Sequence, residues 1–132
     1  MNKNVFIEGF LRKDGFVTPL SDEVMAEYRR PFPIPESRKP ILQRPREIPI
    51  GGEPANVYDI VAANTQFILE SDLPKLAPYA TPGAMMGKPV VHNLAERASN
   101  LEVVDVGPGG HFLQGDQPDA IGQALADWLS RL

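Results

Sequence analysis

The sequence has no cysteine among its 132 residues. Disulfide bridges, thiolate metal sites and a cysteine nucleophile are therefore excluded together. No apolar run approaches the ~18 to 20 residues of a membrane-spanning helix, and the first residues lead into no hydrophobic stretch of a signal peptide. Positive charge is also scarce, because 13 Lys and Arg face 17 Asp and Glu for a net charge of -4, which disfavours binding to a phosphate backbone. We expect a cytoplasmic protein that binds neither nucleic acid nor membrane.

Proline, in contrast, is abundant. Seven of the 14 prolines fall within residues 31–54. Proline has no backbone N–H and pushes the residue before it out of the helical region. We therefore expect this segment to be an extended, stiff loop without a helix. A hydrophobic content of 42% nevertheless indicates a chain that folds and buries apolar side chains.

Hydrophobic spacing and helix-capping residues predict the regular elements. Ser21 followed by two acidic residues is typical of a helix N-cap, and the short helix that it begins should end at Pro31. A longer helix should follow Pro54 and run to Glu70. The rest of the chain should form a strand at 75–80, a helix at 88–98, a strand at 101–106 and a helix at 116–132 capped by Asp116.

This alternation of strands and helices indicates a parallel sheet with helical crossovers. A parallel sheet needs cover on both faces and neighbours along its edges, yet the sequence offers only two convincing strands. Pro78 interrupts the first of them, so a bulge or a weak edge is expected there. The remaining strands must come from another chain or from a segment that is absent, and we interpret the sequence as part of an α/β domain.

Two histidines are candidates for chemistry. His111 follows the turn at 107–110 and lies at the carboxyl end of a predicted parallel strand, where open α/β sheets place their ligands. His92 lies within a predicted helix, where a packing or surface role is expected. Pro108 removes a donor from the glycine-rich turn, which disfavours a nucleotide-binding loop. No serine lies in a nucleophile elbow, and Asp105 inside the strand is a less favoured partner for His111.

The residues around His111 read VDVGPGGHFLQ from 104 to 114, with Asp116 and Pro118-Asp119 following. Further blocks are NVFIEG at 4–9, YRRPF at 28–32, IPIGGEPAN at 48–56 and TPG at 81–83. Together they resemble the haloalkane dehalogenases of the α/β-hydrolase superfamily over essentially the whole chain. The resemblance implies the C-terminal part of an α/β-hydrolase fold. Residues 1–52 would be the later part of a helical cap with its proline-rich return loop, and residues 53–132 would be the C-terminal part of the core.

The resemblance also implies a reaction. In this family an aspartate displaces halide from a haloalkane to form an ester, and a histidine activates the water that hydrolyses this ester. His111 matches that histidine, and no cofactor or metal is implied. The nucleophile, the halide-binding donors and the acid would lie in a missing N-terminal part, so the chain alone should be inactive. Positions that match the apolar pocket or its access tunnel are Phe6, Ile48, Ala84, Met85 and Phe112.

Two alternatives remain open at this point. The chain could be a non-catalytic fragment or interaction module that binds a partner through its sheet edge and proline-rich segment. It could also belong to a sibling α/β-hydrolase that acts on epoxides, in which Tyr28 or Tyr58 would activate the epoxide oxygen.

Overall fold

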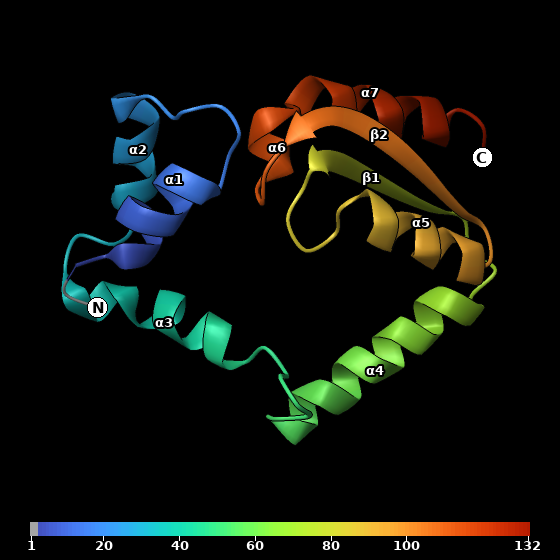
Figure 1. Ribbon diagram of the computed structural model, residues 1–132, viewed down its shortest axis with the longest axis horizontal. Coiled ribbons are helices and arrows are strands. Elements are labelled where there is room, and N and C mark those ends of the chain that lie inside the picture. The colour runs from blue at the N-terminus through green and yellow to red at the C-terminus, as the bar shows by residue number, and fades with distance from the viewer. Residues whose placement is uncertain (1–2) are drawn as a thin grey trace. The chain divides into compact units, whose positions relative to one another are not determined.

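The computed structural model describes residues 3–132, which divide into two compact units. The first unit comprises residues 3–13 and 19–66, and the second comprises residues 14–18 and 67–132. Figure 1 traces the elements of both units along the chain. The short segment 14–18 thus belongs to the same unit as residues 67–132, which follow it by about fifty positions or more in the sequence. The residues on either side of this segment belong to the first unit.

The first unit begins with a π-helix, Phe6–Leu11, followed by α1, Arg12–Asp14. A predicted short helix then appears as α2, Asp22–Arg29, and the Ser21 side chain accepts a hydrogen bond from the Val24 backbone N–H at 3.3 Å. This cap satisfies one of the donors that a helix N-terminus leaves open, and the prediction for Ser21 is confirmed. The buried apolar side chains of this unit are Ile7, Leu11 and Met25.

The prediction that residues 31–54 contain no helix is wrong. A 3₁₀ helix, η2, spans Pro35–Arg38, and α3 follows at Lys39–Arg46. Each of these helices has a proline in its first two positions, where the missing N–H would have had no partner within the helix. Pro45 lies in the last turn of α3, so its lost hydrogen bond coincides with the end of the helix. The spacing of the prolines therefore favours short helices.

The helix α4, Ala55–Glu70, confirms the predicted helix after Pro54. The Pro54 carbonyl accepts hydrogen bonds from the backbone N–H groups of Val57 and Tyr58 at 3.1 and 3.0 Å, which starts the helical ladder. None of its residues is buried, and Phe67 is 60% exposed. Most of its apolar side chains are therefore exposed within residues 3–132. Every helix in this part of the chain is too short or too polar to cross a lipid bilayer.

The second unit is built on two parallel strands, β1, Lys75–Pro82, and β2, Leu101–Gly109. Helix α5, Lys88–Arg97, connects them, and α7, Pro118–Leu129, follows β2. The two helices lie on opposite sides of this small sheet (Figure 1). Both strands and α5 agree with the predicted elements. The buried apolar side chains are Tyr79, Ala80, Val91 and Val106.

The pairing of β1 with β2 is interrupted near its end. Tyr79 pairs with Asp105, but the next pair in register is Thr81 with Pro108, so two residues of β2 face one residue of β1. Gly107 lies within this irregularity with a φ of +98°, a conformation that glycine adopts without strain. The irregularity is therefore a bulge in β2, and the bulge or weak edge expected at Pro78 is not found there. Pro78 itself pairs in register with Val104.

Candidate active site

His111 lies in the turn that joins β2 to a short helix, α6, Leu113–Asp116. Its ring meets the ring of Phe112 edge to face, with centroids 4.7 Å apart and planes at 81°. The side chain of His111 is exposed, and that of Phe112 is half-buried. The structure therefore places an accessible imidazole just beyond the carboxyl end of a parallel strand, where the sequence predicted it.

Two glycines before His111 allow the backbone to pass close to its neighbours. A methyl group at Gly109 would lie 2.7 Å from the Ala80 Cβ in β1. A methyl group at Gly110 would lie 2.8 Å from the carbonyl oxygen of Gly15. Real Cβ atoms essentially never make contacts this short. Glycine is therefore required here by close approach, on one side to the sheet and on the other to segment 14–18.

Asp116 does not cap the last helix, and that prediction is wrong. It ends α6, and α7 begins at Pro118 after Gln117. The Asp116 carboxylate instead accepts hydrogen bonds from the backbone N–H groups of Gly110, Val17 and Thr18. An acid just before a helix is typical of an N-cap, and no local pattern reveals donors about a hundred positions away. The sequence therefore offered no signal for this role.

The loop after β1 lies at the same end of the sheet as His111. The Gly83 N–H donates to the Gly109 carbonyl at 3.0 Å and joins the two loops where the parallel strands end. Ala84 and Met85 follow directly, both are exposed, and Met85 is 71% exposed. The structure therefore brings the loop that carries Ala84 and Met85 to the end of the sheet that bears His111 and Phe112.

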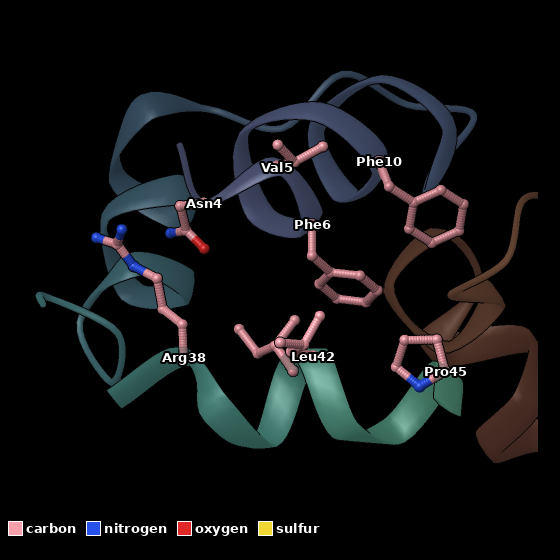
Figure 2. Close-up of a pocket in the computed structure, with 8 residues that line it drawn as sticks. Asn4, Val5, Phe6, Phe10, Arg38, Leu42 and Pro45 are labelled. Carbon is pink, nitrogen blue, oxygen red and sulfur yellow. The ribbon is translucent and has the colours of Figure 1, made fainter. Parts of the chain in front are cut away.

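Phe6 and Ile48 belong to the first unit. Phe6 projects from the π-helix into a mainly apolar cavity of about 300 Å³ in that unit (Figure 2). Ile48 is 47% exposed and is not part of this lining. The grouping of these two residues with His111 stays a prediction. The cavity is lined by Asn4, Val5, Phe6, Phe10, Arg38, Ile41, Leu42 and Pro45.

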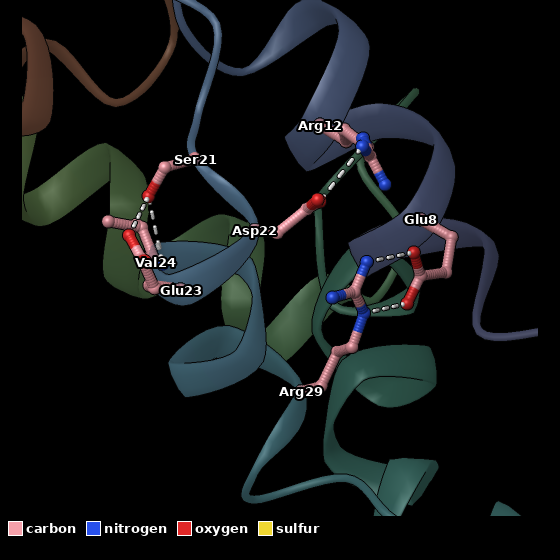
Figure 3. Close-up of polar contacts among 7 residues, drawn as sticks. All are labelled: Glu8, Arg12, Ser21, Asp22, Glu23, Val24 and Arg29. Atoms are coloured by element: carbon pink, nitrogen blue, oxygen red, sulfur yellow. Dashed lines mark hydrogen bonds and ion pairs between the residues drawn. The ribbon is translucent and has the colours of Figure 1, made fainter.

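A bidentate ion pair joins two helices of the first unit. The Arg29 guanidinium donates to both carboxylate oxygens of Glu8, from Nε at 2.6 Å and from an Nη at 2.9 Å (Figure 3). This hydrogen bonding lowers the pKa of the Glu8 carboxyl below its ordinary value. Glu8 is thereby kept ionised and is poorly suited to donate a proton. Its role is to tie the π-helix to α2.

His92 has the packing environment that its position in a helix predicted. Its Nε2 lies 3.3 Å from the hydroxyl oxygen of Tyr79, and the two rings meet edge to face at 5.5 Å. Burial and the neighbouring carboxylate of Asp105 raise the pKa of the Tyr79 hydroxyl. Asp105 also accepts a hydrogen bond from the Gly107 N–H at 2.9 Å, which supports the bulge in β2.

Within residues 3–132 no three His, Asp or Glu side chains are grouped as metal ligands.

Comparisons with known proteins identify similar chains. No family model matches. A haloalkane dehalogenase from Mesorhizobium japonicum is 43% identical over 98% of this chain, and one from Bradyrhizobium diazoefficiens is 41% identical over 98%. The crystal structure of a haloalkane dehalogenase from Bradyrhizobium elkani USDA94 matches 96% of this chain at 40% identity with a TM-score of 0.91, and the match covers 43% of that protein. The chain spans 41 to 42% of the length of the curated relatives.

Proposed function

Because this chain is a relative of the haloalkane dehalogenases, with a partial α/β-hydrolase fold, we propose that it is the C-terminal part of such an enzyme. The enzyme would hydrolyse a small apolar haloalkane to an alcohol and a halide ion. Residues 1–52 would form the later part of the cap, and residues 53–132 would form the last part of the core. A chain that supplies the preceding strands would be needed for activity, because the sheet described here has two strands.

In the proposed reaction, a carboxylate oxygen of an aspartate outside this chain attacks the carbon that bears the halogen. A carbon–oxygen bond forms, the carbon–halogen bond breaks, and the halide leaves with the bonding electron pair. Water then attacks the carbonyl carbon of the ester while His111 takes up a proton from that water. The ester carbon–oxygen bond then breaks, the alcohol leaves with the proton that His111 took up, and the carboxyl group releases the remaining proton of the water to solvent and becomes a carboxylate again. His111 is thus the base of the second step only.

The position of His111 carries this proposal. It lies just beyond the carboxyl end of β2, where ligands of open α/β sheets bind. Its neighbours in the two adjoining loops are apolar or small, as a substrate without hydrogen-bonding groups requires. We assign Ala84, Met85 and Phe112 to the substrate pocket on this basis. Phe6 and Ile48 are assigned to the same pocket or its access tunnel by family resemblance.

The test mixes this chain with a separately produced N-terminal part of the Mesorhizobium japonicum relative and measures halide release from a brominated alkane. The mixture should turn over repeatedly. With His111→Ala, ester formation needs no base, so halide release should stop after about one equivalent and the ester should remain as a mass increase on the partner chain. His92→Ala is the matched control, because His92 packs on Tyr79 and has no part in the proposed reaction.

Each result bears on a separate part of the proposal. Repeated turnover by the His111→Ala mixture at the unsubstituted rate would refute the assignment of the base. Halide release by this chain alone, abolished by His111→Ala, would refute the requirement for an N-terminal part. A mixture active on epoxides and inert towards haloalkanes would refute the substrate class.

A further inference from the structure

One carboxylate joins segment 14–18 to the loop that carries His111. Asp116 Oδ2 accepts hydrogen bonds from the Gly110 N–H at 2.8 Å and from the Val17 N–H at 3.2 Å. Its Oδ1 accepts from the Thr18 N–H at 3.2 Å. Hydrogen bonds to an ionised acceptor are roughly twice as strong as neutral ones. A single side chain therefore gathers three backbone donors from two stretches that are distant in sequence.

Other contacts hold segment 14–18 on the same loop. The Phe112 N–H donates to the Gly15 carbonyl at 2.9 Å. The rings of Phe16 and Phe112 lie 5.5 Å apart. A methyl group at Gly115 would overlap the Phe16 ring, so the helix that contains Gly115 is also in close contact with the segment. The segment is thus packed against the loop by backbone and side-chain contacts.

These contacts lie on both sides of His111. The residue before it, Gly110, donates its N–H to Asp116, and the residue after it, Phe112, donates its N–H to Gly15. The backbone N–H groups of the residues before and after the histidine are therefore both hydrogen-bonded to groups outside β2. A general base acts efficiently only when it is held within about half an ångström of its working position, so control of this backbone matters for the proposed reaction.

We propose that Asp116 is a positioning residue for His111, and that segment 14–18 is the support against which it holds the loop. This inference rests on the proposed function of His111. Asp116 takes no part in proton transfer in this scheme. It holds the backbone of the loop in place, and this fixes the position of the Cα atom that carries the imidazole side chain.

The direct test is amide hydrogen exchange measured by NMR on the full chain. In the unsubstituted chain the amides of Gly110, Val17 and Thr18 should be protected. Asp116→Asn, which keeps the size but loses the charge and one acceptor oxygen, should speed exchange roughly tenfold or more at one or more of these amides. Asp116→Glu should restore part of the protection. Asp119→Asn is the matched control, since Asp119 is an exposed acid three positions on.

The imidazole resonances supply a readout that a general loss of stability would not reproduce. Asp116→Asn should broaden or split the His111 ring signals and leave those of His92, which is packed on Tyr79, unchanged. The proposal is overturned if the three amides exchange at unprotected rates in the unsubstituted chain. It is equally overturned if Asp116→Asn leaves the exchange of all three amides and the His111 signals unaltered.

Kinetics in the mixture described above separate this inference from the function on which it rests. Asp116→Asn should slow ester hydrolysis by about tenfold or more and leave the first equivalent of halide at its original rate. If His111→Ala slows hydrolysis and Asp116→Asn does not, the positioning role is wrong and the base stands. If neither variant slows hydrolysis, the proposed function of His111 has failed while the exchange results still report on Asp116.

Discussion

A methyl group at Gly110 should weaken the second unit, whereas one at Gly122 should strengthen it. At Gly110 the added carbon would lie 2.8 Å from the Gly15 carbonyl oxygen and 3.1 Å from the Phe16 Cα. Both neighbours are backbone atoms, so no side-chain rotation can relieve the contact. Segment 14–18 would have to retreat by about half an ångström against the hydrogen bonds to Asp116, and crowding of this kind costs about 1 to 3 kcal/mol.

Gly122 lies inside α7 with no other atom within 4 Å of the position that a methyl group would take. Alanine there should stabilise the helix by about 0.5 to 1 kcal/mol. Both substitutions reduce the freedom of the unfolded chain by the same small amount, about 0.4 to 1 kcal/mol. Gly110→Ala should therefore lower the free energy of unfolding by up to about 2.6 kcal/mol net, and Gly122→Ala should raise it.

The assay is urea unfolding of the full chain followed by tryptophan fluorescence, because Trp128 in α7 is the single tryptophan and is half-buried in the second unit. Equal slopes with shifted midpoints would indicate that stability alone has changed. A midpoint for Gly110→Ala at or above that of the unsubstituted chain would refute the close contact between segment 14–18 and the loop that carries His111.

Two further predictions concern titrating groups. Because pairing with Arg29 lowers the pKa of Glu8, the stability that this pair contributes should be present above pH ~4.3 and lost as the pH falls through the lowered value. Glu8→Gln should remove this part of the pH dependence of the melting temperature. A melting temperature that falls with acid in the same way in both proteins would contradict the prediction. Because burial raises the pKa of Tyr79, the stability of the fold should decline as the pH rises above about 10, where the tyrosine of the unfolded chain ionises first. Tyr79→Phe should remove the component of the phenolate absorbance that appears at the highest pH. An unaltered absorbance titration would refute the argument from burial.

Much of the second unit could be predicted from the sequence, because local patterns determine it. The alternation of apolar segments marked both strands and α5, and the glycine turn placed His111 at the end of β2. The same reasoning failed for residues 31–54, because it counted prolines without asking which position each would occupy. Pro40 at the start of α3 and Pro45 in its last turn are tolerated where interior prolines would break a helix. The π-helix Phe6–Leu11 was also not foreseen.

The sequence by itself determined the class of the fold, the two parallel strands and the place of His111 just after the second of them, since these depend on residue type and on spacing along the chain. Only the tertiary structure decided which groups form hydrogen bonds with the loop that carries this histidine. Asp116 looked like a helix cap because its neighbours in sequence suggested one, yet its three donors come from Gly110 and from residues 17 and 18. Such a contact arises when the folded chain brings distant backbone groups together, and no local pattern encodes it.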